Sequence, residues 1–85
     1  MKLIQHVINQ KMNRISGEEL LKYAKQYSVK LSIKEANQIA QYLRGKNYDV
    51  FDDQQRSHII KQLAKISGPK TAREVNRLFL QFTDS

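Results

Sequence analysis

The side chains that most often perform chemistry are sparse in this 85-residue sequence. It contains no cysteine, which excludes disulfides, cysteine zinc sites, iron–sulfur clusters and thiol catalysis. His6 and His58 are its only imidazoles, and neither has an Asp or Glu at the spacing of a metal-ligand pair. The dense carboxylates form two groups, Glu18-Glu19 and Asp49 with Asp52-Asp53, and both stand at expected helix starts, where the macrodipole favours negative charge. We therefore expect no metal, no cofactor, no catalytic residues and no enzyme activity.

One segment invites comparison with a phosphate-binding loop, because Ser67-Gly68-Pro69-Lys70-Thr71 precedes an expected helix. A P-loop requires a glycine five residues before its Gly-Lys-Ser/Thr end. Leu63 occupies that position here, and Pro69 separates Gly68 from Lys70. The sequence therefore argues against nucleotide hydrolysis, and it leaves open a plain helix start or occasional anion capture.

Two other helical motifs fail on particular positions. A calcium-binding helix–loop–helix needs an oxygen-rich loop of twelve residues, and the connector at residues 28–32 contains no carboxylate. A DNA-binding helix-turn-helix favours glycine in its tight turn and an apolar residue early in its second helix. The chain has Ser28 and Lys34 at those points, and its connector is too long.

The charge balance is the clearest functional signal. Fifteen Lys and Arg residues against eight Asp and Glu residues give a formal net charge of +7, and the isoelectric point is near 9.9. The surplus lies in residues 1–34 and 61–85 rather than in a tail. Such a surplus favours anionic partners, with nucleic acid as the first candidate. Solubility alone also explains it, and both readings stay open.

Five cations are the candidate anion or nucleic-acid contacts. On the last expected helix, three of them share one sector, opposite the apolar stripe. Two more lie in a loop tip, the usual place for binding residues. The alternatives are a solvent-facing helix surface, interrupted by Glu74, and a capped helix end. The five are Lys70, Arg73 and Arg77 on the helix, and Arg44 and Lys46 in the loop.

The elements that must position these residues are helices. Apolar residues recur at three- and four-residue spacing, no apolar run exceeds three residues, and 40% of the chain is hydrophobic. This pattern predicts one domain over residues 1–85, without a membrane span or a signal peptide. Ser16 with Glu19 and Ser32 with Glu35 form capping boxes. We predict an all-α fold of five helices near residues 2–13, 17–27, 33–44, 53–66 and 69–82.

These helices should pack as an N-terminal helix plus two helical hairpins. The predicted core contains Leu21, Ala24, Ile39, Leu43, Ile60, Leu63, Val75 and Phe79. The first helix carries a stripe that we expect to be buried, formed by Leu3, Ile4, Val7, Ile8, Met12 and Ile15. Small chains often complete their cores by dimerising, but a monomer is slightly favoured here. The monomer suffices if Leu3 and Val7 pack within their own chain.

Three segments resemble a known family. They are Glu18-Glu19-Leu20-Leu21-Lys22-Tyr23, Leu43-Arg44-Gly45-Lys46-Asn47 and Val75-Asn76-Arg77-Leu78-Phe79-Leu80-Gln81-Phe82. Together they resemble a domain-of-unknown-function family of short uncharacterised proteins from bacillus-type bacteria, over the whole chain. The resemblance implies a bacterial, cytoplasmic protein, and it offers no catalytic residues to carry over.

Two function classes follow from these observations. The first is a non-catalytic binding module whose paired amphipathic helices dock an unknown protein partner. The second is a basic nucleic-acid-binding protein that contacts phosphates through the five cations. The sequence lacks an evident aromatic platform for single strands and a convincing recognition helix, which favours the protein partner.

Overall fold

The computed structural model describes residues 2–83, except for the side chains of Lys2 and Phe82. Over this range it contains five α-helices and no strand, which confirms the predicted all-α class. Every observed helix boundary lies within one residue of the predicted one. The helices are α1 (Lys2–Arg14), α2 (Gly17–Gln26), α3 (Ile33–Leu43), α4 (Asp53–Ser67) and α5 (Pro69–Thr83).

Polar caps fix where α2 and α3 begin. The Ser16 hydroxyl accepts a hydrogen bond from the Glu19 backbone N–H at 3.1 Å, and the Glu19 carboxylate accepts from the Ser16 N–H at 3.2 Å. Ser32 and Glu35 repeat this reciprocal arrangement at α3, with distances of 3.1 and 3.0 Å. Both predicted capping boxes are therefore confirmed. Gly45, after the end of α3, has φ +75°, the left-handed conformation that glycine adopts at low cost.

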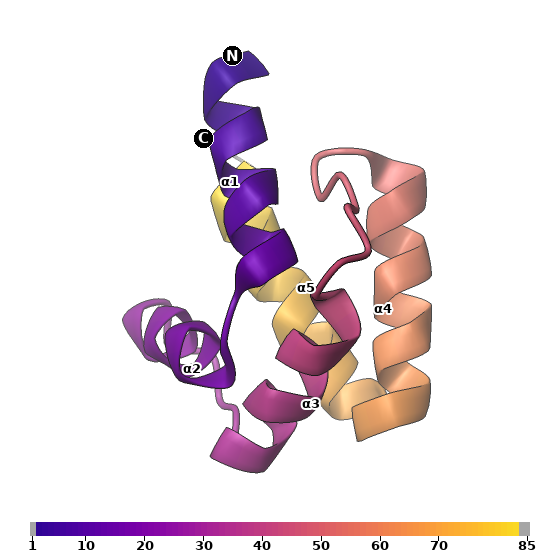
Figure 1. Cartoon of the computed structure of the whole chain (residues 1–85). Coiled ribbons are helices and arrows are strands. Elements are labelled where there is room, and N and C mark those ends of the chain that lie inside the picture. The colour runs from indigo at the N-terminus through magenta and orange to yellow at the C-terminus, as the bar shows by residue number, and fades with distance from the viewer. Residues whose placement is uncertain (1, 84–85) are drawn as a thin grey trace.

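The helices pack mainly with their neighbours in the chain (Figure 1). Helix α2 packs against α3, and α4 packs against α5, while α3 also contacts α1 and α4. Helix α3 therefore joins the two pairs. The N-terminal turns of α1 extend beyond the other helices at the top of Figure 1, so only part of α1 is covered by them.

The core lies between these helices. Six of the eight predicted core residues are buried: Ala24, Ile39, Leu43, Leu63, Val75 and Phe79. The prediction is wrong for Leu21 and Ile60, which are only half-buried, because their neighbours Leu20 and Ile59 point into the core instead. Adjacent helical residues point about 100° apart. Which of two neighbouring apolar residues is buried depends on where the next helix crosses.

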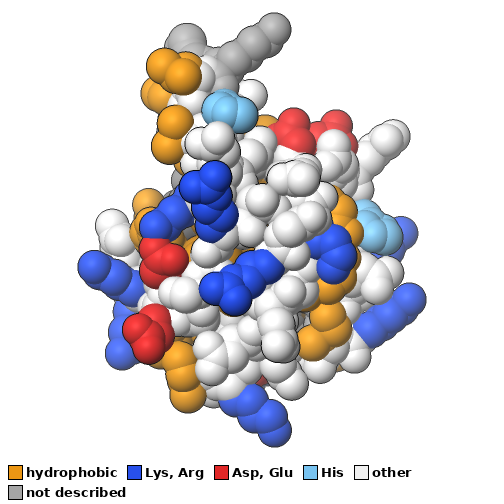
Figure 2. All heavy atoms as spheres, viewed as in Figure 1, with side chains coloured by type: hydrophobic (Ala, Val, Ile, Leu, Met, Phe, Trp, Pro, Cys, Tyr) orange, Lys and Arg blue, Asp and Glu red, His pale blue; other side chains and the backbone are white. Residues whose placement is uncertain are grey.

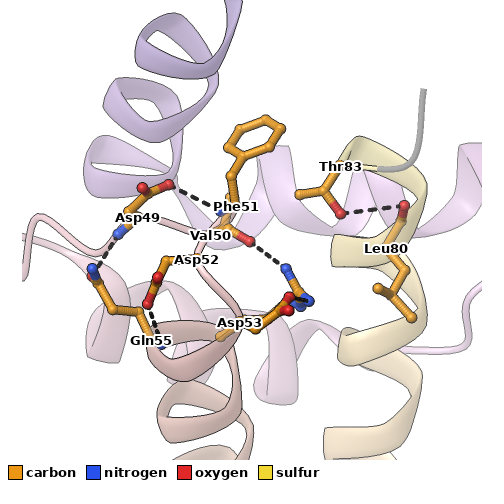
Figure 3. Close-up of polar contacts among 9 residues, drawn as sticks. Asp49, Val50, Phe51, Asp52, Asp53, Gln55, Leu80 and Thr83 are labelled. Atoms are coloured by element: carbon orange, nitrogen blue, oxygen red, sulfur yellow. Dashed lines mark hydrogen bonds and ion pairs between the residues drawn. The ribbon is translucent and has the colours of Figure 1, made fainter. Parts of the chain in front are cut away.

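The loop between α3 and α4 is held by a network of polar contacts (Figure 3). Asp52 caps α4, accepting from the Gln55 backbone N–H at 2.9 Å, while the Gln55 side chain accepts from the Asp49 N–H at 2.8 Å. Arg56 donates to the Val50 carbonyl at 2.9 Å and forms an ion pair with Asp53. Val50 itself is fully buried, so the loop is anchored by both polar and apolar contacts.

Candidate functional site

The N-terminal half of α1 presents an exposed apolar face. Leu3 is 75% exposed, Ile4 62% and Val7 56%. Leu3 and Val7 are one helical turn apart, and Ile4 lies beside them, so the three side chains share one side of α1. Hydrophobic side chains gather at this end of the molecule in the view of Figure 2. The other large apolar residues exposed in the described chain are Tyr27, Ile33, Ile66 and Leu80, which are 37–49% exposed.

The exposed face corrects the expected burial of the whole α1 stripe. Met12 and Ile15 are buried, and Ile8 is half-buried against the core, as a packed helix requires. The prediction is wrong for the first two turns, since Leu3, Ile4 and Val7 point away from the body. Amphipathic spacing shows that one face of a helix is apolar, but it does not show that the same chain covers that face.

Two asparagines set the orientation of α1. The Asn9 side chain donates to the Asp49 carboxylate at 2.9 Å and accepts from the Val50 N–H at 3.0 Å. One turn later, the Asn13 side chain accepts from the Asn47 N–H at 2.9 Å. These bonds attach one side of α1 to the loop between α3 and α4. The side carrying Leu3, Ile4 and Val7 consequently stays in solvent.

The apolar face continues toward α2 as a small hollow. Ile8, Met12 and Tyr23 line this hollow of about 190 Å³ together with the chain of Lys11. The Lys11 ammonium forms an ion pair with Glu19, which raises the pKa of Lys11 and lowers the pKa of Glu19. The charged end of Lys11 is therefore held by α2, beside the hollow. The hollow is therefore lined mainly by apolar side chains of α1 and α2.

The two predicted loop cations lie just after α3. Arg44 is the C-terminal cap of α3, and its side chain borders an open hollow of about 450 Å³ with Ser16 and Gly17. Lys46 donates to the Tyr42 carbonyl at 3.0 Å, and its Nζ lies 4.3 Å from the centre of the Tyr42 ring. Lys46 is thus engaged within its own chain through a hydrogen bond and a cation–π contact.

The three predicted helix cations lie on α5. Arg73 is exposed, and Lys70 borders a hollow of about 490 Å³ that Lys25 and Lys30 also line. Arg77 donates to the Ser28 carbonyl at 2.9 Å and lies 3.6 Å from the Glu74 carboxylate. Arg44 and Lys70 line two different hollows, so neither of these hollows brings a loop cation and an α5 cation together. In Figure 2, Lys and Arg side chains are spread over the face that is shown.

An aromatic cluster that is not evident from the sequence lies beside Lys46. The Tyr42 and Tyr48 rings are stacked with centres 6.0 Å apart, and their hydroxyls share a 2.8 Å hydrogen bond. The centre of the His58 ring lies 5.9 Å from the centre of the Tyr48 ring. Burial, reinforced by the bond with Tyr48, raises the pKa of Tyr42 to about 12. Three segments of the chain supply these rings, so sequence spacing could not have revealed the cluster.

The described residues form neither a metal-binding group nor a membrane-spanning helix. Over residues 2–83, no group of three or more His, Asp or Glu side chains could hold a metal ion. None of the helices described is long and apolar enough to cross a membrane. The carboxylates of Glu19, Glu35 and Asp52 instead serve as helix caps.

Comparison with known proteins places these features in a family context. Residues 1–83 match the family described as "Protein of unknown function (DUF2624)". The chain is also similar to the uncharacterized protein YqfT of Bacillus subtilis (strain 168), with 41% identity over 81 residues, covering 95% of this chain and 96% of that protein. No solved structure matches the chain.

Proposed function

The chain belongs to the DUF2624 family of proteins of unknown function, and on the evidence of its own surface we propose that it is a small, non-catalytic binding module that docks a protein partner. The docking face is the exposed apolar side of α1, formed by Leu3, Ile4 and Val7. The cytoplasmic location implied by the family resemblance is part of this proposal.

One observation carries the proposal: three large apolar side chains are exposed together on two turns of a helix that extends from the body. Single exposed apolar residues are ordinary on protein surfaces, whereas clusters mark binding sites. Covering a cluster of this kind releases ordered water and favours association. The polar bonds of Asn9 and Asn13 support the same conclusion, because they hold the face in one orientation before any partner arrives.

The non-catalytic part of the proposal is supported by the use of the carboxylates. Glu19 and Glu35 accept hydrogen bonds from the backbone at the starts of α2 and α3, and Glu35 also accepts from the Thr71 hydroxyl of α5. These bonds favour the charged carboxylate and lower the pKa of Glu35, whereas a general acid needs a raised pKa. A role in helix capping accounts for both residues.

The proposal is tested by site-specific photo-crosslinking in a bacterial host of the family. A photoreactive amino acid replaces Val7 in one variant and Ile66 in the matched control, where an isoleucine that is 40% exposed lies on α4. We expect a discrete protein adduct from position 7, and its loss when Leu3→Ser is added. Adducts that form equally at both positions, or at neither, would contradict a docking role for α1.

Nucleic-acid binding is the second candidate, favoured by one observation. Lys25, Lys30 and Lys70 surround the same hollow, although Glu35 and Glu74 line it too. If several side chains contact phosphates, raising the salt concentration from about 50 to about 200 mM should weaken binding by orders of magnitude. For this candidate we expect a steep salt dependence with duplex or single-stranded probes.

A pair of charge-neutralising variants refines that test. Lys70→Gln should reduce the slope of affinity against salt by about one unit if Lys70 contacts a phosphate. Lys22→Gln, at an exposed position of α2, is the control for the change in net charge. Absence of binding at the lower salt concentration would exclude this candidate.

A further inference from the structure

The first turns of α1 have the composition of a packed helix. Residues 3–10 contain no Lys, Arg, Asp or Glu, although these residues make up 27% of the chain. One other run of eight residues is equally free of charge, residues 36–43 of α3. That run lies at the centre of the fold and contributes four buried residues. The two runs are alike in composition, but the residues that the structure describes do not cover residues 3–10 in the same way, because Leu3, Ile4 and Val7 are exposed.

We propose that a second copy of this chain covers that face, with the two α1 helices packing antiparallel around a two-fold axis near Ile4 and Val7. The inference rests on the proposed function, because it identifies the partner of the same apolar face. Each α1 would place Leu3, Ile4 and Val7 against the same residues of the other copy. The half-buried Ile8 extends the contact toward the hollow beside Tyr23.

The distribution of charge favours a second copy. In a two-fold interface the same surface patch meets itself, so a patch with a net positive charge faces an equal net positive charge. A chain with a net charge of +7 would repel itself across most patches. The uncharged run at residues 3–10 lets two copies approach without that repulsion. An acidic partner, by contrast, would find no cation to pair with inside this run.

The positions of Lys11 and Arg14 favour the antiparallel arrangement. Both follow the uncharged run at the C-terminal end of α1, and Arg14 is exposed. A parallel pair would set Arg14 beside its own copy and align the two positive helix N-termini. An antiparallel pair separates the two Arg14 side chains by the length of the contact. It brings Ile4 of one copy next to Val7 of the other.

The size of the face sets the expected strength. Stable interfaces bury about 800 Å² on each partner, and two helical turns carrying three exposed apolar side chains offer less. We therefore expect a weak, reversible dimer with a dissociation constant in the micromolar range. Because the contact is apolar, added salt should leave the association intact, unlike one driven by surface charge.

Sedimentation equilibrium on the full chain, from about 5 to about 500 μM, tests the proposal. We expect the wild-type chain to pass from monomer to dimer over this range. The double variant Leu3→Glu with Val7→Glu should weaken dimerisation at least about 100-fold, because each interface would then bury unpaired carboxylates. Both positions are exposed in the monomer, so folding should be retained, as circular dichroism can verify. Ile66→Glu, at a similarly apolar position on α4, should leave the dimer unchanged.

Thiol crosslinking tests the orientation, since the natural chain has no cysteine. A mixture of Ile4→Cys and Val7→Cys chains is treated with a short bismaleimide. Crosslinks between Cys at position 4 of one chain and position 7 of the other (4–7) should form faster than crosslinks between two chains at position 4 (4–4). Faster 4–4 and 7–7 products would overturn the antiparallel arrangement. A chain that stays monomeric up to the highest concentration, or a dimer that persists in the Leu3→Glu and Val7→Glu variant, would overturn the second copy.

The outcomes also separate this inference from the proposed function. A monomeric chain that still forms a heterologous adduct at position 7 would overturn the second copy and leave the protein-docking function standing. A monomeric chain without such an adduct would overturn both. Binding of the monomer to anionic vesicles through α1 would replace both with a membrane contact. The uncharged polar residues of its first turns argue against that outcome, since interfacial helices usually carry Lys and Arg there.

Discussion

The tight crossing of α2 and α3 gives a sharp test of the structure at Gly17. Gly17 is the first residue of α2 and is buried against Asn37 of α3. A Cβ atom at position 17 would lie 1.8 Å from the Asn37 Oδ1, 2.7 Å from its Cγ and 2.9 Å from its Cα. The Asn37 side chain is exposed and can rotate away, but the Cα belongs to the α3 backbone. Gly17→Ala therefore forces the two helices apart by several tenths of an ångström.

The magnitude follows from two opposing contributions. Overpacking of this kind costs about 1–3 kcal/mol, while alanine gains at most about 1 kcal/mol over glycine in a helix. We expect Gly17→Ala to lower the free energy of unfolding by about 1–2 kcal/mol. For a chain of this size, that corresponds to a fall in Tm of roughly 4–16 °C. Urea denaturation followed by circular dichroism measures the change directly.

A double-mutant cycle separates the two parts of the clash. In an Asn37→Ala background the contacts with Oδ1 and Cγ are gone, and the contact with Cα remains. The cost of Gly17→Ala should therefore shrink in that background without vanishing. Gly45→Ala is a useful contrast, because the space around it is open and its positive φ of +75° is the only obstacle. If Gly17→Ala caused no loss of stability relative to its parent, either in the wild-type chain or in the Asn37→Ala chain, the close approach of α2 and α3 would be refuted.

Three further predictions concern polar contacts. Hydrogen bonds from Thr71 and Ser32 lower the pKa of Glu35, so they stabilise the fold above the unfolded-state pKa of about 4.3. This contribution to stability is lost as the pH falls through the lower pKa that Glu35 has in the folded state. Thr71→Val should therefore reduce the free energy of unfolding at pH 7 and make it depend less steeply on pH in acid. An unchanged pH profile of urea unfolding would contradict this. Tyr48→Phe should bring the pKa of Tyr42 down from about 12 without restoring the ordinary value, because burial is the larger cause; absorbance at 295 nm against pH measures it, and no shift would exclude the shared bond. Asn9→Ala should lower the free energy of unfolding by about 1–3 kcal/mol through the loss of two bonds to the α3–α4 loop; urea titration measures it, and a change below about 0.5 kcal/mol would show that the loop is held by other contacts.

The helices were predicted well because the signals that start and end a helix depend only on residues a few positions apart in the sequence. Ser16 and Ser32 each stand three residues before a glutamate, and the same pairs of side chains form the caps in the folded chain. Gly45 and Pro69 mark a helix end and a helix start for reasons of backbone geometry alone. None of these signals requires knowledge of another helix.

Contacts between segments were harder to predict, because they depend on how the helices cross. The choice of Leu20 over Leu21 and of Ile59 over Ile60 is made by the neighbouring helix. The Tyr42, Tyr48 and His58 cluster likewise needs three segments to be in place. A weak signal for the anchoring of α1 was present, since Asn9 and Asn13 are four residues apart and share a helix face. The partners of those amides, in the α3–α4 loop, could not be read from that spacing.

The behaviour of α1 shows what an amphipathic pattern does and does not specify. Its stripe is continuous from Leu3 to Ile15 in sequence, yet burial within the chain begins only at Ile8 and is complete at Met12. A helix that packs against another molecule needs the same spacing of apolar residues as a helix that packs in the core, because both need one apolar side. The lack of charge across residues 3–10 adds what spacing alone cannot, since a merely solvated helix end gains nothing from excluding Lys and Glu. An apolar, uncharged and exposed helix face, oriented by Asn9 and Asn13, is therefore best explained as one half of an interface.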